Sequence, residues 1–330
     1  MKLTAFEVRE DEVKVFAMLA SQYGIEIAYV QQLLSPENVD LAEGSAGVTV
    51  LGFSQVSREV LSQLKALGVS FLSTRTIGYN HIDLAAATEL GIRVSNANYG
   101  PHGVADYTVM LMLMSLRKYK QALFRANVND YSLNGLQGRE MKDMTIGIVG
   151  TGKIGSKVID NLSGFGSRIL AYDTIVNEHV SRKAEYVSLD ELYRQSDIIS
   201  LHVPLFESTA QMINKESIAK MKDGVILVNC ARGELMNITD LISAIEHEKI
   251  GALALDVFEK EEGIYHFDRR TDIIKNRDMA YIRQFPNVIM TQHIAFYTDT
   301  AVGDMVSFGV KSLVSFVQEG RAETEIFFRP

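Results

Sequence analysis

Polar side chains follow three apolar runs in the second half of the chain, at the point where each run stops. Arg232 comes after "VILVNCA", Asp256 lies within "GALALDVFEKE" and Glu261 ends it, and His293 ends "NVIMTQH". An arginine can clamp a carboxylate through two parallel hydrogen bonds, and an imidazole can exchange a proton near neutral pH. A glutamate beside the imidazole would orient it and stabilise its protonated form. Together these residues indicate a site that binds a small carboxylate and moves a proton.

Each of these residues also has a structural interpretation when it is taken alone. Arg232 could belong to a surface ion pair, Glu261 lies in the acidic run "EKEE", which would ordinarily be solvated, and a lone histidine after a strand is often structural. Of the seven histidines, His293 alone directly follows the last predicted strand, whereas His81 and His102 fall in loops of the first part. No HxxxH, CxxC or clustered carboxylate spacing is present, so we predict no metal site. Arg232, Glu261 and His293 indicate a catalytic site only when they are taken together.

A glycine-rich turn lies within "TIGIVGTGKIGSKVID", residues 145–160. A bare G-x-G-x-x-G is weak evidence, but this one follows an apolar strand, opens a helix, and precedes Asp173 at the end of the next strand. Gly150 permits the tight turn, Gly152 the close approach of a pyrophosphate, and Gly155 the packing of helix on strand. The carboxylate of Asp173 would accept hydrogen bonds from ribose hydroxyls and repel a 2′-phosphate. We therefore predict that the cofactor is NAD, not NADP.

Alternating strands and helices must position these residues. In the second half, six apolar runs rich in Val, Ile and Leu predict strands at 145–150, 167–173, 198–203, 225–230, 251–257 and 287–293. Six such strands with helices between them predict a complete doubly wound, dinucleotide-binding α/β fold. Ligands bind beyond the carboxyl ends of strands in such folds, so the turn, the arginine and the histidine should converge on one crevice.

The residues in front of the glycine turn form another α/β series. Its predicted strands are 3–8, 25–30, 47–53, 69–76 and 92–97. A long segment follows at 103–126, and its Met and Leu residues cover most of its circumference, which predicts a buried connecting helix.

The tail after residue 297 is strongly helical and comes after the second sheet is complete. Because chain ends often lie close together, we expect this tail to return to the first series. We therefore predict a substrate domain of residues 1–101 plus 298–330, with a cofactor domain of residues 102–297 inserted into it.

The bulk properties exclude several classes of protein. At 330 residues, 47% hydrophobic and 22% charged, the chain suits two globular domains. The formal net charge of −8 disfavours nucleic-acid binding, which needs a basic surface. No apolar run approaches the roughly 18–20 residues of a membrane span, and acidic residues interrupt the N-terminus where a signal peptide would be apolar. The lone Cys230 fits a reducing cytosol.

Five motifs carry a family resemblance: "GTGKIG", "LHVPL", "NCARGEL", "ALDVFEKE" and "QHIAFYT". In this order and spacing they resemble the D-isomer-specific 2-hydroxyacid dehydrogenases over nearly the whole chain. The likeness is greatest to the D-lactate and D-2-hydroxyisocaproate dehydrogenase branch, including the D-lactate dehydrogenases of vancomycin resistance. The stretches "STRTIGYNHIDLAAATELGI" and "VADYTVMLMLM" share that branch's pattern. The resemblance implies an NAD-binding Rossmann domain inserted into a flavodoxin-like α/β substrate domain.

The resemblance also implies a role for individual residues. Arg232 matches the arginine that binds the substrate carboxylate and polarises its carbonyl, His293 the general acid/base, and Glu261 its carboxylate partner. The implied cofactor contacts are Gly150, Gly152, Lys153, Ile154, Gly155, Asp173, Val203, Pro204, Thr209, Cys230, Ala231, Arg232 and Asp256, the last near the nicotinamide amide. The implied substrate contacts, besides Arg232 and His293, are Ile77, Gly78 and Tyr99.

The sequence also departs from the family pattern. Gly100 stands where this branch often has serine, and Asp106 where many members have glutamate, which puts the shape of the substrate loop in doubt. Cys230 stands where many relatives have threonine. The family pattern pairs no histidine with this position, which disfavours a nucleophilic role for Cys230.

The expected function is a reversible, NADH-dependent reduction of a 2-oxo acid to the D-2-hydroxy acid, with pyruvate as the first expected substrate. Hydroxyisocaproate and aryl-lactate dehydrogenases share every motif above and remain alternatives. A different class is a regulatory protein that uses this fold to sense NAD(H). The family implies a homodimer through the cofactor domains and a first domain that closes over the substrate. We expect a cytoplasmic enzyme with no nucleic-acid or membrane partner.

Overall fold

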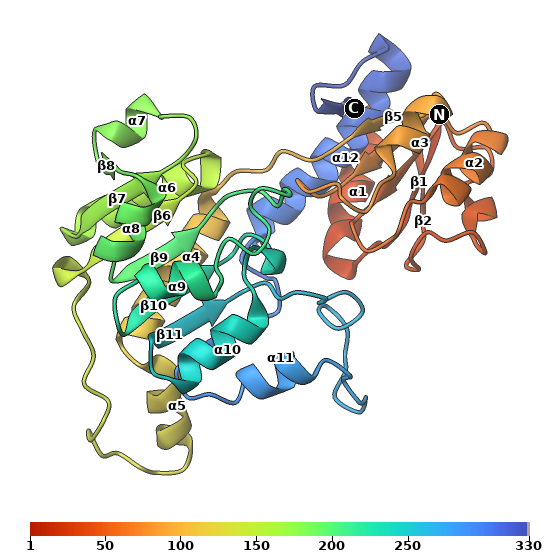
Figure 1. The fold of residues 1–330 in the computed structure, drawn as a ribbon. Coiled ribbons are helices and arrows are strands. Elements are labelled where there is room, and N and C mark those ends of the chain that lie inside the picture. Colours follow the sequence, from red (N-terminus) through yellow and green to blue (C-terminus); the bar gives the residue numbers. More distant parts are fainter. Residues whose placement is uncertain (329–330) are drawn as a thin grey trace. The chain divides into compact units, whose positions relative to one another are not determined.

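The computed structural model describes residues 1–328, which form two compact units. Unit 1 contains Met1–Gly100 and the C-terminal segment from Tyr297, and unit 2 contains Pro101–Phe296. Each unit is a mainly parallel sheet with helices on both faces (Figure 1).

Unit 1 is built on a six-stranded sheet with the order β13-β5-β4-β3-β1-β2. The first five strands in the chain are parallel and have the flavodoxin-like order 2-1-3-4-5. The short β13 pairs antiparallel with β5 at one edge. The strands are β1 (Lys2–Ala5), β2 (Glu26–Tyr29), β3 (Gly47–Val50), β4 (Phe71–Thr74), β5 (Arg93–Ser95) and β13 (Glu325–Ile326). The helices are α1 (Glu10–Tyr23), the 3-10 turn η1 (Val39–Ala42), α2 (Arg58–Ala66), α3 (Leu84–Glu89) and α12 (Asp299–Glu319).

The helical tail packs in unit 1. Leu313 and Val310 of α12 pack with Phe16 of α1 and Leu3 of β1 in one apolar cluster. By length and composition α12 is the one helix within residues 1–328 that could cross a membrane. Its apolar stretch is 56% buried in the structure, as in the core helix of a globular domain. The prediction that no apolar run approaches the length of a membrane span is therefore wrong for the residues of α12.

Unit 2 is built on a seven-stranded parallel sheet with the order β12-β11-β10-β9-β6-β7-β8. Numbered from β6, this is the dinucleotide-binding order 3-2-1-4-5-6 with a seventh strand added. The strands are β6 (Thr145–Val149), β7 (Arg168–Tyr172), β8 (Glu185–Tyr186), β9 (Ile198–Leu201), β10 (Val225–Asn229), β11 (Ile250–Leu255) and β12 (Val288–Met290).

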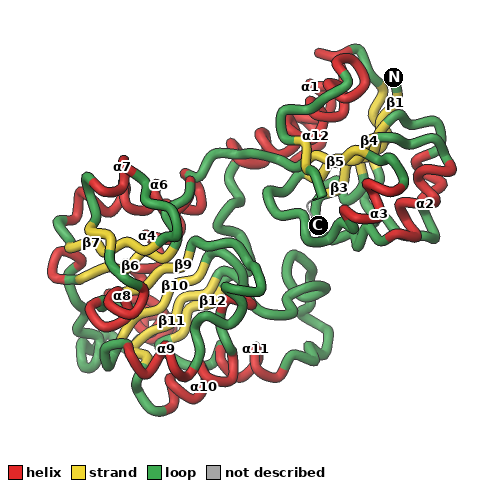
Figure 2. Tube along the Cα trace, turned by 45° about the horizontal axis from the view of Figure 1, so that its top comes forward, coloured by secondary structure: helices red, strands yellow, loops and turns green. Residues whose placement is uncertain are grey.

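Helices cover both faces of this sheet, which separates two apolar cores (Figure 2). One core lies under α4 and α6, and the other lies under α8, α9, α10 and α11. The helices are α4 (His102–Leu116), α5 (Tyr119–Asn127), α6 (Lys153–Leu162), α7 (Glu178–Ser181), α8 (Leu189–Gln195), α9 (Lys215–Lys220), α10 (Ile238–Glu246) and α11 (Arg277–Ile282). The 3-10 turns are η2 (Met141–Asp143), η3 (Ser163–Phe165) and η4 (Gly233–Leu235). The predicted fold class is confirmed in both units.

The predicted single helix over 103–126 is wrong. The chain breaks at Lys118, which has φ +49°, and α5 follows with no buried residue. The break is stabilised by distant contacts, because the carbonyl of Leu116 accepts a hydrogen bond from the amide of Arg139 at 3.1 Å. The Lys120 ammonium then donates to the carbonyls of Arg283, Phe285 and Val288, each at 2.7 Å. Only α4 is the buried helix that the apolar pattern predicted.

Candidate active site

The glycine turn follows β6 and leads into α6. Gly150 has φ +95°, a conformation that favours glycine. A Cβ on Gly155 would lie 1.9 Å from the carbonyl oxygen of Gly150, so only glycine lets the first turn of α6 pack on the loop. A Cβ on Gly152 would meet nothing within 4 Å. Gly152 is the N-cap of α6, and the first amides of a helix have no acceptor within the helix itself. The turn therefore fits a dinucleotide's pyrophosphate.

Asp173 directly follows β7 and is tied to the same turn. Its Oδ2 accepts hydrogen bonds from Thr151 N at 2.6 Å and from Thr151 Oγ1 at 3.2 Å. Partial burial acts to raise the pKa of Asp173, but the hydrogen bonds from Thr151, Thr174 and Ile175 outweigh it and hold that pKa below its ordinary value. The side chain is therefore a carboxylate at neutral pH, fixed at the end of the strand beside the glycine turn.

The remaining predicted cofactor residues also lie at the carboxyl ends of strands. Val203 and Pro204 follow β9, and Thr209 Oγ1 donates to the carbonyl of Pro204 at 2.7 Å. Cys230 and Ala231 follow β10. Burial raises the pKa of the Cys230 thiol to about 12, which leaves it protonated and argues against a nucleophilic role. Lys153 and Ile154 begin α6.

Arg232 lies in the turn between β10 and η4. The side chain of Asn229 shapes this turn, since its Oδ1 accepts from Ala231 N at 2.9 Å and its Nδ2 donates to the carbonyl of Arg232 at 2.8 Å. A Cβ on Gly233 would lie 2.2 Å from the carbonyl carbon of Phe258, so the arginine turn packs directly on the segment after β11.

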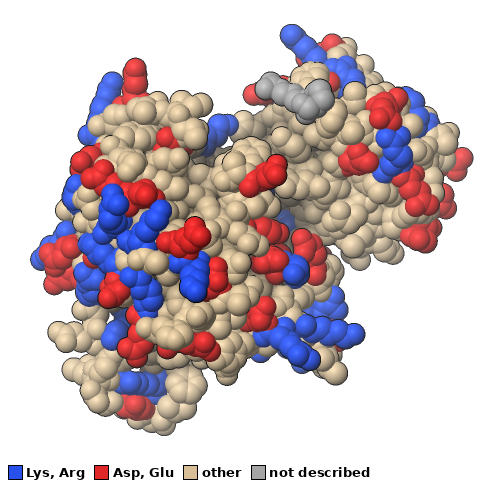
Figure 3. Space-filling model, viewed as in Figure 1, with Lys and Arg blue, Asp and Glu red and all other residues tan. Residues whose placement is uncertain are grey.

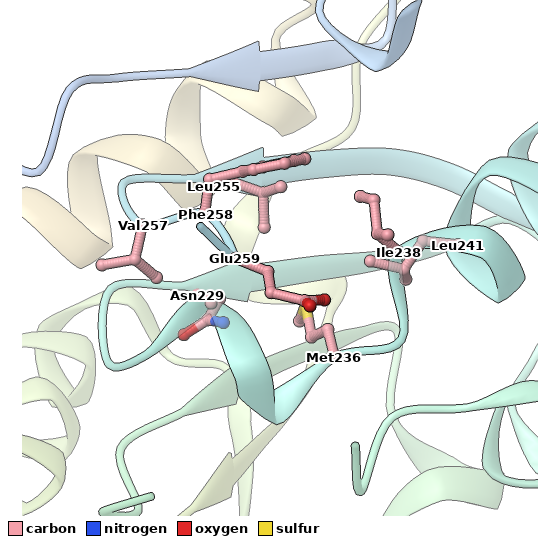
Figure 4. A pocket seen from close by; sticks show the side chains of 9 residues that line it. Asn229, Met236, Ile238, Leu241, Leu255, Val257, Phe258 and Glu259 are labelled. Carbon is pink, nitrogen blue, oxygen red and sulfur yellow. The ribbon is translucent and has the colours of Figure 1, made fainter. Parts of the chain in front are cut away.

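The seam between these two segments is shown in Figure 4, with Asn229, Met236, Leu255 and Phe258 around it. It encloses about 10 Å³, at most enough for one water molecule, so it is a packing seam and not a ligand site.

His293 and Glu261 are in direct contact. The Nδ1 atom of His293 lies 2.5 Å from Glu261 Oε1, and Glu261 Oε2 accepts from the amide of Phe258 at 2.7 Å. Glu261 is thus fixed from both sides of its carboxylate. A carboxylate on Nδ1 sets the ring orientation and directs Nε2 as the proton-exchanging atom.

Asp256 organises the turn that carries His293. It is fully buried, and its carboxylate accepts from Thr291 Oγ1 at 2.6 Å, Ile294 N at 3.0 Å and Ala295 N at 2.8 Å. Its carbonyl accepts from His293 N at 2.7 Å. His293 itself has φ +56°, which costs a non-glycine residue about 1–3 kcal/mol and persists only where neighbours enforce it.

The predicted substrate residues of unit 1 lie beyond β4 and β5. The carbonyl of Ile77 accepts from Asn96 Nδ2 at 2.7 Å, and the carbonyl of Gly78 accepts from Thr76 Oγ1 at 2.6 Å. Tyr99 is half-buried near the end of unit 1. Arg232, Asp256, Glu261 and His293 thus lie in unit 2. The predicted substrate residues Ile77, Gly78 and Tyr99 lie in unit 1.

Several residues that contribute to the site are not among those predicted from the sequence. Thr151 binds Asp173, Phe258 supplies an amide to Glu261, and Tyr107 of α4 lies near Asp256 and Thr291. Burial, with the nearby Asp256 and Cys230, raises the pKa of Tyr107. Position relative to the motifs could have indicated Thr151, which lies inside the glycine turn. The backbone donor at Phe258 could not have been found in this way, because every residue has one.

The arrangement places a glycine turn at a helix start, the carboxylate of Asp173, the side chain of Arg232 and the imidazole–carboxylate pair of His293 and Glu261 at the carboxyl edge of one sheet. Such a set can hold a dinucleotide and exchange a proton with a small acid. Among residues 1–328 no group of three or more His, Cys, Asp or Glu side chains is arranged to hold a metal ion.

Comparisons with known proteins agree with this chemistry. Residues 109–295 match the NAD binding domain of the D-isomer specific 2-hydroxyacid dehydrogenases. An aromatic 2-oxoacid reductase of Clostridium sporogenes is 42% identical over 98% of this chain and 99% of its own, and a D-lactate dehydrogenase of Lactiplantibacillus plantarum is 35% identical over 99% and 100%. A solved structure of D-2-hydroxyisocaproate dehydrogenase has a TM-score of 0.91 and 32% identity, and covers 99% of this chain and 100% of its own. The chain belongs to the NAD-dependent, D-isomer-specific 2-hydroxyacid dehydrogenase family.

Proposed function

We propose that this D-2-hydroxyacid dehydrogenase works as an NADH-dependent 2-oxo acid reductase in which His293 is the general acid and Glu261 its partner. The observation that carries the proposal is the 2.5 Å contact between His293 Nδ1 and Glu261 Oε1. During reduction, protonated His293 gives a proton from Nε2 to the oxygen of the 2-oxo group. Glu261 stabilises the charged ring before the transfer and keeps its orientation afterwards. In the oxidation direction His293 accepts that proton.

Arg232 is the proposed anchor for the substrate carboxylate. Its guanidinium can form two parallel hydrogen bonds with a carboxylate, which fixes the orientation of the neighbouring 2-oxo group. Ile77, Gly78 and Tyr99 are proposed as further substrate contacts, a role that rests on their match to the family motifs.

The glycine turn and Asp173 are proposed to hold NAD at its pyrophosphate and adenosine ribose. Lys153, Ile154, Val203, Pro204, Thr209, Cys230 and Ala231 are proposed to line the rest of that site. Asp256, whose oxygens already accept three hydrogen bonds, retains a lone pair for the carboxamide of the nicotinamide. When bound, NADH supplies the hydride that reduces the 2-carbon of the substrate.

The side chain of the substrate is proposed to be aromatic. The support is the 42% identity to an aromatic 2-oxoacid reductase, against 35% to a D-lactate dehydrogenase. Pyruvate, the first expectation from the sequence, is the second candidate and is supported by the latter relative.

The test is NADH oxidation followed at 340 nm with phenylpyruvate, 4-methyl-2-oxopentanoate and pyruvate offered separately. We expect the largest kcat/KM for phenylpyruvate. A larger value for pyruvate would make D-lactate the product. Binding of NADH without turnover of any of the three acids would contradict the reductase proposal and favour a sensor of NAD(H).

We also propose a homodimer formed through unit 2. Six large apolar side chains on α5 and the loop after it are exposed: Tyr119, Leu123, Phe124, Val128, Tyr131 and Leu133. Few charged side chains lie over this part of the surface (Figure 3). Since contiguous exposed apolar patches mark interaction sites, a second copy of this chain is the proposed occupant. Light scattering should give twice the mass of one chain, and the double variant Phe124→Asp, Leu133→Asp should give the mass of one chain.

A cytoplasmic location is also proposed, supported by the single cysteine.

A further inference from the structure

His266 lies in the loop between β11 and α11, and it contacts the residue proposed as the acid. Its Nε2 atom lies 3.0 Å from the backbone carbonyl oxygen of His293. A carbonyl oxygen can only accept, so His266 Nε2 carries the hydrogen and donates it. The two imidazole centroids are 6.1 Å apart, and both rings lie 6.2 Å from the ring of Phe296.

His293 needs such anchors because its backbone is in the left-handed region, with φ +56°. Its amide donates to the carbonyl of Asp256 at 2.7 Å, and its ring is held by Glu261. The peptide that follows His293 is held on its amide side by Asp256, which accepts from Ile294 N. The hydrogen bond from His266 holds the carbonyl side of that same peptide. The carbonyl direction sets ψ of His293 and therefore the direction in which its side chain leaves the backbone.

We infer that His266 is a positioning residue for proton transfer, fixing the backbone of His293 so that its imidazole meets both Glu261 and the substrate oxygen. This inference rests on the proposed role of His293 as the acid. The hydrogen bond from His266 acts on the backbone of His293, so its loss should change the chemical step more than the binding of NADH. A displacement of about 1 Å at a reacting group can cost about a hundredfold in rate.

Two substitutions separate the hydrogen bond from the ring packing. His266→Phe keeps an aromatic ring beside Phe296 and removes the donor, whereas His266→Gln keeps a terminal N–H and removes the ring. His247→Phe is the matched control, because the Nδ1 atom of the exposed His247 lies 2.7 Å from the carbonyl of Ser243 in α10, outside the site.

We expect His266→Phe to lower kcat by roughly tenfold or more with both phenylpyruvate and pyruvate. The Kd for NADH should stay within about twofold, since no proposed cofactor contact changes, and the deuterium isotope effect from C4-deuterated NADH should rise because the chemical step becomes slower. His266→Gln should recover kcat to within about threefold of the unmodified enzyme, because one neutral hydrogen bond is retained. His247→Phe should leave all of these quantities unchanged.

A readout without turnover keeps this inference separate from the reductase proposal. The short His293–Glu261 contact should give a strongly downfield imidazole N–H proton resonance, lost in His266→Phe and retained in His266→Gln. Unmodified protein that turns over no 2-oxo acid would refute the reductase proposal, while the resonance would still test the positioning role. Unchanged kcat and resonance in His266→Phe, or equal losses in the Phe and Gln variants, would overturn the inference. A loss confined to phenylpyruvate would also overturn it, since His266 would then act on the substrate side chain.

Discussion

The Nδ1 atom of His293 and the Oε1 atom of Glu261 are 2.5 Å apart, and the second oxygen of Glu261 is held by the amide of Phe258 at 2.7 Å. The carboxylate therefore cannot rotate away from the imidazole without losing a backbone hydrogen bond. The pair is built from two loops that follow different strands, β11 and β12, so the sheet register determines its geometry.

Replacing Glu261 with Gln should lower kcat for reduction by about 10²-fold, because an amide cannot stabilise the imidazolium as a carboxylate does. Replacing His293 with Asn should cost about 10²–10⁴-fold. The ratio of the two losses measures how much of the acid's effect depends on its partner. Steady-state kinetics with saturating NADH would provide both values. A kcat for His293→Asn near that of the unmodified enzyme would exclude His293 as the acid.

Arg232→Lys should raise the KM for the 2-oxo acid as well as lower kcat. The ammonium offers a point charge in place of the planar fork, so about 1.5–3 kcal/mol of charge-assisted hydrogen bonding is lost. The Kd for NADH, measured by fluorescence titration, should change little by comparison. An unchanged KM would show that the carboxylate is bound elsewhere.

The parts of the site that could be predicted from sequence are those in which residue type and strand end coincide. Arg232 and His293 follow apolar runs that the structure makes into β10 and β12, and the glycine turn follows β6. Parallel strands bring their carboxyl ends to one edge, so these positions follow from topology.

The remaining features depend on contacts between distant segments. The break at Lys118 is stabilised by Arg139 and by carbonyls near residue 285, none of which changes the apolar pattern of 103–126. The left-handed backbone of His293 is likewise enforced by Asp256, 37 positions earlier in the sequence. The strands β8 and β13 have two residues each, too few for a periodicity to be visible.

Asp173→Asn should shift the cofactor preference toward NADPH more cleanly than Asp173→Ala. The amide oxygen of Asn can still accept from Thr151 N, which keeps the glycine turn in place, while the negative charge that repels a 2′-phosphate is gone. Ala loses that bond too and should weaken binding of both cofactors. The kcat/KM values for NADH and NADPH would measure this, and an unchanged ratio in Asp173→Asn would mean that another residue discriminates.

Acid should destabilise the protein through His202, at the end of β9. Burial lowers the pKa of this imidazole to about 4, and its Nε2 lies 2.9 Å from Ser200 Oγ. Between about pH 6.5 and 4 the unfolded chain binds a proton at this position that the folded chain does not, so the free energy of unfolding should fall with falling pH. The contribution of His202 to the slope of the unfolding free energy against pH should be at most about 1.4 kcal/mol per pH unit, and this slope should vanish above about pH 6.5. In His202→Asn, denaturation across this range should show a shallower slope, and an equal slope would contradict the assignment.

The buried ion pair of unit 1 gives a test of stability independent of catalysis. Arg75 and Glu12 are both fully buried, with Nε 2.8 Å from Oε1, and the guanidinium also donates to the carbonyls of Phe6 and Glu7. Arg75→Met leaves Glu12 as an unpaired buried charge and should destabilise unit 1 by about 3–5 kcal/mol.

Arg75→Met combined with Glu12→Leu should be less destabilised than Arg75→Met alone, because the unpaired buried charge is gone and the groups left without their partner are neutral backbone groups, the carbonyls of Phe6 and Glu7 and the amide of Arg9. Arg58→Met is the matched control, since Arg58 pairs with Glu89 on the surface, and it should change stability by less than about 1 kcal/mol. Urea denaturation followed by tyrosine fluorescence would give the three values. Glu12 also accepts a hydrogen bond from the amide of Arg9 at 3.0 Å. A double variant less stable than Arg75→Met would show that Glu12 stabilises unit 1 more through this bond than through its ion pair with Arg75.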